Sequence, residues 1–218
     1  MSIQLVIFDL DGTLIDSRQD LANAVNATRA HMGLGPLDNQ RVYSYVGNGA
    51  LELIRRSLGN AGGDAEVSSA TKFFLGHYRA HVLDSTTLFP GVQESLERLH
   101  HAGKRMAVLT NKPEDMSRAI VDGLGVGGYF FRVYGGNSLE TRKPDPMGAA
   151  ALMKEAGSTR ATTVMVGDSS VDVVTARNAG IACCAVTYGF QPETLADPAP
   201  DLLVDHMEQV TEWILSRP

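Results

Sequence analysis

Two aspartates one residue apart follow a short apolar run near the N-terminus. The run Leu5–Phe8 is rich in β-branched and aromatic residues, which is typical of a buried parallel strand, and Asp9 and Asp11 come where it ends. Burying two carboxylates is unfavourable unless a cation or a proton offsets their charge. The pattern therefore predicts a metal site or an acid/base pair. An Asp-Gly turn is the alternative, but it explains only Asp11 and Gly12 and leaves Asp9 without a reason.

Polar side chains also end two later apolar runs. Thr110 and Asn111 follow the run Met106–Leu109, and Asp168 follows the run Thr163–Val166. Since the carboxyl ends of parallel strands meet at one edge of a sheet, we expect these side chains to lie near the first aspartate pair. Taken singly, they have local explanations: Thr110 and Asn111 suit a turn and a helix cap, and Asp168 suits a turn.

Two further charged residues lie close to these runs. Lys143 precedes Pro144, which disfavours a helical conformation at the lysine, so we expect Lys143 to project from an extended loop. Asp172 comes four residues after Asp168. A solvated lysine and a charge on a helix surface are the local alternatives. Together, the hydroxyl, amide, ammonium and carboxylate groups are suited to binding phosphate or a metal ion.

Apolar runs alternate with helix-length segments through most of the chain. Besides the first run, we expect strands at Met106–Leu109, Phe131–Tyr134, Thr163–Val166, Ile181–Val186 and Leu202–Val204. We expect helices at Val92–His101, Asp115–Leu124, Pro146–Glu155 and Val171–Ala179, the last ending at Gly180. This alternation predicts an α/β fold with a parallel sheet and helices on both faces.

One interval breaks the alternation. Between residues 16 and 84 we expect no strand, and helices at Gln19–Met32, Ala50–Leu58 and Glu66–Leu83, with a loop at Asn60–Asp64. This block is too long for an ordinary crossover. We interpret residues 16–84 as an inserted helical cap domain, joined by linkers near Leu14–Ser17 and Asp84–Pro90 to a core formed by residues 1–15 and 85–218.

Composition narrows the class of partner. The chain has 218 residues, 44% of them hydrophobic and 20% charged, and a net charge of −6, which argues against nucleic acid or an anionic membrane as the main partner. It contains no apolar stretch of membrane-spanning length and no N-terminal signal pattern. Cys183 and Cys184 are adjacent and lack metal-ligand spacing, so we expect them to be reduced in a cytoplasmic protein. The oligomeric state stays open.

The polar clusters, in this order, resemble the four motifs of the haloacid dehalogenase-like hydrolase superfamily. Those motifs correspond here to Asp9-Leu10-Asp11-Gly12-Thr13, Thr110-Asn111, Lys143-Pro144 and Gly167-Asp168-Ser169-Ser170-Val171-Asp172. With the helical insertion after the first motif, the resemblance covers essentially the whole chain. Within the superfamily the chain is most similar to the phosphoglycolate phosphatases. The resemblance also implies a Rossmann-like core sheet whose first strand is central.

The resemblance implies a role for each motif residue. Asp9 is the expected nucleophile, which forms an aspartyl-phosphate, and Asp11 the expected acid and base. Mg²⁺ is the expected cofactor, held by the carboxylates of Asp9 and Asp168 and the main-chain carbonyl of Asp11. The phosphoryl oxygens are expected to contact Thr110, Asn111 and Lys143. Asp172 is expected behind these ligands, where it orients a water or Lys143.

The substrate is expected to be a small phosphorylated metabolite, with 2-phosphoglycolate the leading candidate. In the cap, Gly47 and Asn48 precede a helix whose amides would face an anion, and Arg55 is a candidate clamp for a substrate carboxylate. A flexible helix entry and a solvated arginine are the alternatives. The activities left open are a sugar-phosphate phosphatase, a pyrophosphatase and a β-phosphoglucomutase. A non-catalytic metabolite-binding protein on the same fold is a further alternative, although Asp9, Asp11 and Asp168 are all present.

Overall fold

The computed structural model describes residues 2–59 and 63–217, so most of the loop expected at residues 60–64 lies outside the described part. The chain divides into two compact units. The sheet unit comprises Met1–Asp16 and Leu88–Pro218, and the helical unit comprises Ser17–Thr87. The role of the helical unit as a cap stays a prediction.

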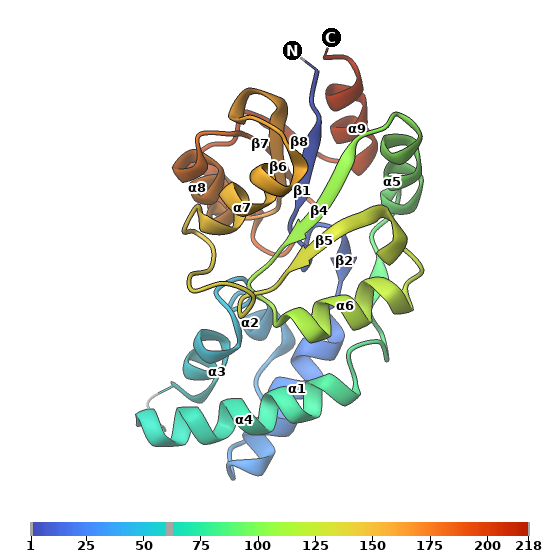
Figure 1. Cartoon of the computed structure of the whole chain (residues 1–218). Coiled ribbons are helices and arrows are strands. Elements are labelled where there is room, and N and C mark those ends of the chain that lie inside the picture. Colours follow the sequence, from blue (N-terminus) through green and yellow to red (C-terminus); the bar gives the residue numbers. More distant parts are fainter. Residues whose placement is uncertain (1, 60–62, 218) are drawn as a thin grey trace. The chain divides into compact units, whose positions relative to one another are not determined.

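The sheet unit is built on six parallel strands. In spatial order they are β5 (Phe130–Tyr134), β4 (Arg105–Leu109), β1 (Leu5–Phe8), β6 (Thr163–Gly167), β7 (Ala182–Val186) and β8 (Leu202–Val204). Figure 1 shows β1 inside the sheet, between β4 and β6. The predicted parallel sheet with a central first strand is confirmed.

Helices cover both faces of this sheet (Figure 1). They are α5 (Val92–His101), α6 (Glu114–Gly123), α7 (Met147–Ala156), α8 (Ser170–Ala179) and α9 (Met207–Leu215), with 3₁₀ turns at Gly127–Tyr129, Arg160–Thr162 and Pro192–Ala196. Helix α8 ends at Gly180, whose φ of 69° is left-handed, as predicted for a glycine stop. Helix α9 was not predicted.

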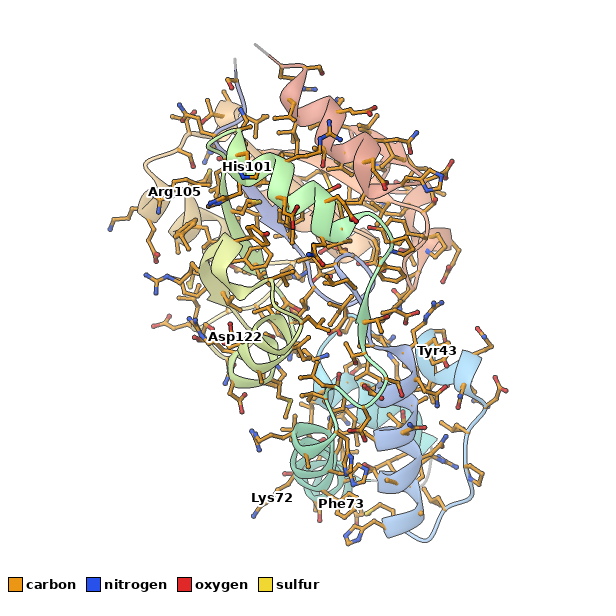
Figure 2. The ribbon with its side chains drawn as sticks, turned by 90° about the vertical axis from the view of Figure 1, so that its right-hand side faces the viewer. Tyr43, Lys72, Phe73, His101, Arg105 and Asp122 are labelled. Atoms are coloured by element: carbon orange, nitrogen blue, oxygen red, sulfur yellow. The ribbon has the colours of Figure 1, made fainter. Side chains whose placement is uncertain are left out.

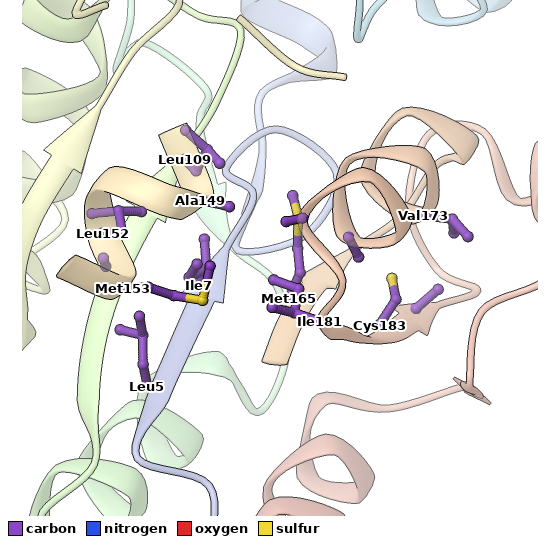
Figure 3. Close-up of a cluster of buried hydrophobic side chains, with 14 of the residues drawn as sticks. Leu5, Ile7, Leu109, Ala149, Leu152, Met153, Met165, Val173, Ile181 and Cys183 are labelled. Carbon is purple, nitrogen blue, oxygen red and sulfur yellow. The ribbon is translucent and has the colours of Figure 1, made fainter. Parts of the chain in front are cut away.

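The four inner strands β4, β1, β6 and β7 are mostly buried because both faces of the sheet are covered. Alternate residues of β1 point to opposite faces, and Leu5 and Ile7 share one face with Met165 of β6 (Figure 3). Leu152 of α7 and Val173 of α8 belong to the same apolar cluster. Burial of these side chains therefore fixes the register of the strands, and with it the position of the residues that follow them.

The helical unit contains four helices among its described residues, where three were predicted. They are α1 (Arg18–His31), α2 (Asn39–Tyr43), α3 (Ala50–Leu58) and α4 (Asp64–Ala80). Phe73 of α4, labelled in Figure 2, stacks on His31 of α1 with ring centroids 4.0 Å apart. The end of the unit is tied to α1, because the buried Asp20 carboxylate accepts hydrogen bonds from the N–H groups of Ser85 and Thr86.

The linker segments are more ordered than predicted. Each contains a short strand, β2 (Ile15–Asp16) and β3 (Thr87–Leu88), and the two strands pair with each other. No helix within the described residues is both long and apolar enough to cross a membrane.

Candidate active site

The polar motifs lie at the carboxyl edge of the sheet because their strands are neighbours. Phe8 at the end of β1 is opposite Val108 of β4 on one side and Val166 of β6 on the other. The three strands therefore end at the same edge of the sheet. Because Asp9 follows β1 and Asp168 follows the neighbouring β6, the two residues lie side by side at this edge.

Three carboxylates meet at this edge. Oxygen atoms of Asp9, Asp168 and Asp172 lie within 4.8 Å of one another, and the three residues are 7%, 3% and 0% exposed. Asp9 thus joins Asp168 and Asp172, which follow it by 159 and 163 positions in the chain, in one buried acidic cluster. Such a concentration of carboxylates is unfavourable unless a cation or a bound proton offsets its charge.

Lys143 supplies part of that compensation. Its Nζ lies 2.8 Å from Oδ1 of Asp9 and 2.7 Å from Oδ1 of Asp172, and its side chain is 2% exposed. The lysine lies in a loop, as predicted, but its side chain turns inward onto two carboxylates and does not project into solvent. Burial lowers the pKa of Lys143, yet the charges of Asp172 and Asp9 more than offset this and raise it, so the ammonium is retained.

One lysine does not neutralise the cluster. Burial, with a further contribution from Asp172, raises the pKa of Asp9 to about 7, even though Lys143 acts in the opposite direction. Burial and the charges of Asp172 and Asp9 raise the pKa of Asp168 well above its ordinary value. Lys143 therefore offsets only part of the charge that Asp9 and Asp168 carry when both are ionised. A divalent cation would lower these pKa values and keep both groups ionised.

Asp172 is fixed at the start of α8. Its Oδ2 accepts hydrogen bonds from the N–H groups of Asp168 and Ser169 at 3.3 and 3.2 Å, and from the Ser169 hydroxyl at 2.9 Å. Its Oδ1 is bound to Lys143. Both oxygens of Asp172 are thus engaged by protein groups, and its role in orienting a water or Lys143 stays a prediction.

A loop after β7 encloses Asp168. The Phe190 N–H donates to Oδ2 of Asp168 at 2.7 Å, and the Tyr188 hydroxyl donates to the carbonyl of Thr13 at 2.8 Å. Thr13 itself, the last residue of the first motif, donates from its hydroxyl to Oδ1 of Asp168 at the longer distance of 3.4 Å. The loop was not predicted to belong to the site. No local pattern marks it, because its role depends on β7 lying beside β6.

Glycine is required where this carboxylate approaches the first motif. Gly12 has a φ of 88°, and a Cβ placed there would lie 2.2 Å from Oδ2 of Asp168. Any other residue would therefore be strained and would displace the carboxylate. The Asp-Gly pair in the first motif is thus explained by a close approach across the sheet.

Asp11 is held by a residue that the sequence interpretation missed. Nζ of Lys112 lies 2.6 Å from Oδ1 of Asp11, and the two side chains are 4% and 13% exposed. Lys112 directly follows Thr110 and Asn111, in the segment just after β4, and this position was a signal for a role in the site.

Thr110 and Asn111 are 3% and 7% exposed and lie at the same edge. The Asn111 amide donates to the carbonyl of Lys143 at 3.1 Å, and the Thr110 hydroxyl accepts from the N–H of Lys112 at 3.3 Å. Asn111 thereby links the second motif to the loop that carries Lys143. Their contact with a phosphoryl group stays a prediction.

The three substrate-specificity candidates belong to the helical unit. Gly47 and Asn48 are partly buried and precede Gly49, which caps α3 with a φ of 85°. Arg55 forms an exposed ion pair with Asp64 at 3.0 Å, so a local partner already accounts for its charge. Lys72, labelled on α4 in Figure 2, is exposed.

Comparison with known proteins agrees with the motifs. The family model for haloacid dehalogenase-like hydrolases matches residues 6–186. A phosphoglycolate phosphatase of Pseudomonas fluorescens is 39% identical over 216 residues, which cover 95% of this chain and 78% of that protein. One from Chromobacterium violaceum is 40% identical over 192 residues, or 86% of each chain.

Solved structures agree as well. The crystal structure of a predicted phosphoglycolate phosphatase from Haemophilus somnus superposes with a TM-score of 0.92 at 30% identity and covers 98% of both chains. The chain therefore belongs to the haloacid dehalogenase-like hydrolases, the family that its four motifs predicted, and it is a hydrolase.

Proposed function

We propose that this protein is a Mg²⁺-dependent phosphatase of small phosphorylated metabolites, with 2-phosphoglycolate as its substrate. The observation that carries the proposal is the buried Asp9 carboxylate, which lies against Lys143 inside an acidic cluster. The names of the similar proteins, which are phosphoglycolate phosphatases, support the choice of substrate.

The donor set suits Mg²⁺, which prefers hard oxygen ligands. Asp9 and Asp168 are the carboxylates expected to hold it, together with the main-chain carbonyl of Asp11. Asp172 is less suited to direct ligation because both of its oxygens are already bound to protein groups. When bound, the ion supplies positive charge that draws the phosphoryl oxygens to Asp9 and withdraws electrons from phosphorus.

In the first chemical step, Asp9 attacks phosphorus and an aspartyl-phosphate forms. The bond from phosphorus to the leaving oxygen breaks, its electron pair stays on that oxygen, and the Asp11 carboxyl gives it a proton. In the second step, the Asp11 carboxylate takes a proton from water, the resulting oxygen attacks phosphorus, and phosphate is released as Asp9 is restored. Asp11 therefore acts as an acid in the first step and as a base in the second.

The remaining residues offset charge and position the phosphoryl group. The Lys143 ammonium, 2.8 Å from Asp9, opposes the repulsion between the nucleophile and the phosphoryl oxygens. Thr110 and Asn111 are the expected hydrogen-bond donors to those oxygens. Because uncatalysed hydrolysis of phosphate monoesters is so slow, enzymatic accelerations can reach ~10²¹-fold, and electrostatic stabilisation is usually the largest single contribution.

A screen of phosphate release tests the proposal. Wild-type protein with Mg²⁺ is assayed on 2-phosphoglycolate, hexose phosphates and pyrophosphate, beside the isosteric Asp9→Asn variant. We expect the highest kcat/KM on 2-phosphoglycolate and no turnover by Asp9→Asn. A preference for another substrate would refute the substrate assignment, and full activity of Asp9→Asn would refute the mechanism.

A further inference from the structure

The sheet unit buries a second lysine whose role the proposed mechanism leaves open. Lys112 Nζ is 2.6 Å from Oδ1 of Asp11, while Lys143 contacts Asp9 and Asp172. The two ammonium groups therefore contact different carboxylates. Lys143 contacts the proposed nucleophile Asp9, whereas Lys112 contacts Asp11, the proposed acid and base.

The burial of Lys112 indicates a specific requirement. Its side chain is 4% exposed, whereas lysines usually keep their ammonium in water. Burying an ammonium is unfavourable unless a partner offsets the desolvation. The carboxylate of Asp11 is one such partner, 101 positions away in sequence, and the contact requires β1 and β4 to be neighbours.

The backbone around Lys112 is itself well fixed. Its N–H donates to the Thr110 hydroxyl at 3.3 Å, and its carbonyl accepts from the N–H of Gly136 at 2.9 Å. A Cβ at Gly135 would lie 2.6 Å from that carbonyl oxygen, so the neighbouring loop is packed closely against it. Lys112 therefore extends from a constrained segment toward Asp11.

We propose that Lys112 is a positioning residue for Asp11, and this inference rests on the proposed function. Its ammonium holds one carboxyl oxygen, which sets the direction in which the other faces the reacting oxygen. Proton transfer requires donor and acceptor to be within hydrogen-bonding distance in a defined orientation. Lys112 thus acts through Asp11 and does not itself contact the phosphoryl group.

The first experiment compares two substrates that differ in their need for a proton. The p-nitrophenolate group leaves without protonation, whereas the alkoxide of 2-phosphoglycolate requires it. Because kcat/KM reports the steps up to phosphoryl transfer, it isolates the acid role of Asp11. We expect Lys112→Met to lower kcat/KM on the alkyl phosphate by about 10–100-fold, part of the 10²–10⁴-fold that general acid catalysis contributes, and on p-nitrophenyl phosphate by less than about 3-fold.

The second experiment is a double-mutant cycle. If Lys112 acts only through Asp11, adding Lys112→Met to an Asp11→Asn background lowers activity no further. This double variant also removes both charges, so it avoids the charge imbalance of the single variant. Lys112→Gln, which keeps a hydrogen-bond donor, replaces Lys112→Met if the latter does not fold. Lys154→Met, at an exposed lysine of α7, is the matched control and is expected to have wild-type activity.

The outcomes separate this inference from the function on which it rests. A wild-type protein inert toward both substrates would refute the proposed function and the inference together. An active wild type with equal losses on both substrates in Lys112→Met would overturn the inference alone. Additive losses in the double variant would also overturn it, because Lys112 would then act on the substrate directly.

Discussion

Replacing Lys143 by methionine should destabilise the sheet unit strongly, because it removes a cation that two buried carboxylates share. The Nζ–oxygen distances are 2.7 and 2.8 Å. Each contact is worth about 6 kcal/mol at an effective dielectric constant of ~20, before the cost of desolvation. Desolvation offsets much of this, and removing one partner of a buried pair costs roughly 3–5 kcal/mol. Since 1 kcal/mol shifts the midpoint by roughly 2–4 °C in a protein of this size, we expect Tm to fall by roughly 6–20 °C.

The loss should depend on pH in a defined direction. The pKa of Asp9 is about 7 in the folded protein against an ordinary value of 3.8, with burial the largest cause. A carboxyl whose folded pKa is raised stabilises the fold when protonated, and this contribution is lost as pH rises through the folded pKa. Without Lys143 the pKa of Asp9 rises further. The penalty of Lys143→Met should therefore be larger at pH 8 than at pH 5.5.

Thermal unfolding in EDTA, at both pH values, measures this effect. Lys154→Met, which removes an exposed lysine, is the control and should unfold with the wild type. The double variant Lys143→Met/Asp172→Asn should recover part of the loss, because it also removes one of the stranded charges. Equal midpoints for Lys143→Met and Lys154→Met would refute the reasoning.

Three further predictions follow from the same geometry. Gly12→Ala should lower kcat by about 10²-fold, because its Cβ would lie 2.2 Å from Oδ2 of Asp168. The control is Gly103→Ala, which should leave kcat unchanged because Gly103 has a similar φ of 71° but no atom within 4 Å of an added Cβ. Similar losses of kcat in both variants would contradict this prediction. Mg²⁺ at 100 times its Kd should stabilise the folded wild type by about 2.7 kcal/mol, which is measured as an increase in Tm. Asp168→Asn should abolish this increase. A wild-type Tm that Mg²⁺ leaves unchanged would argue against a metal site. Cys183 and Cys184 are buried, and burial raises the pKa of both thiols, that of Cys184 to about 12. Iodoacetamide should therefore label them only after the protein is unfolded in urea. Rapid labelling of the native protein would show that the two thiols are not buried.

The parts of the fold that could be predicted are those with strong local patterns. The run Leu5–Phe8 is apolar throughout and completely buried, and the glycine at position 180 ends α8 as its type suggests. Element limits differ by up to three residues, as in α4, which ends at Ala80 where Leu83 was expected. Local sequence defines an element well but its last turn poorly.

The elements that were missed have weaker signals or unusual ends. Helix α2 has five residues and β2 has two, which is too short to establish a period. Helix α9 does carry a stripe, with Met207, Val210 and Ile214 buried, but His206 stands at its N-cap in place of the usual small polar residue.

In the site, too, the residues with a strong local sequence signal were predicted and those without one were missed. Asp9 and Asp168 were recognisable because each ends an apolar strand, and their order matches a known motif series. Lys112 and the loop at Tyr188–Phe190 were not recognised, because their contacts join strands that are neighbours only in the folded sheet. The inward orientation of Lys143 is likewise a consequence of the tertiary fold, since its attraction to two carboxylates outweighs the solvation that a local reading assumes.

The central claim is that Asp9 carries the phosphoryl group during turnover. Acid quenching of the wild type during the hydrolysis of radiolabelled 2-phosphoglycolate, followed by peptide mapping, measures this directly. We expect label on the peptide that contains Asp9, released by hydroxylamine as an acyl-phosphate would be, and no label on Asp9→Asn. Turnover by a wild type that never acquires label, or equal labelling of Asp9→Asn, would contradict the account.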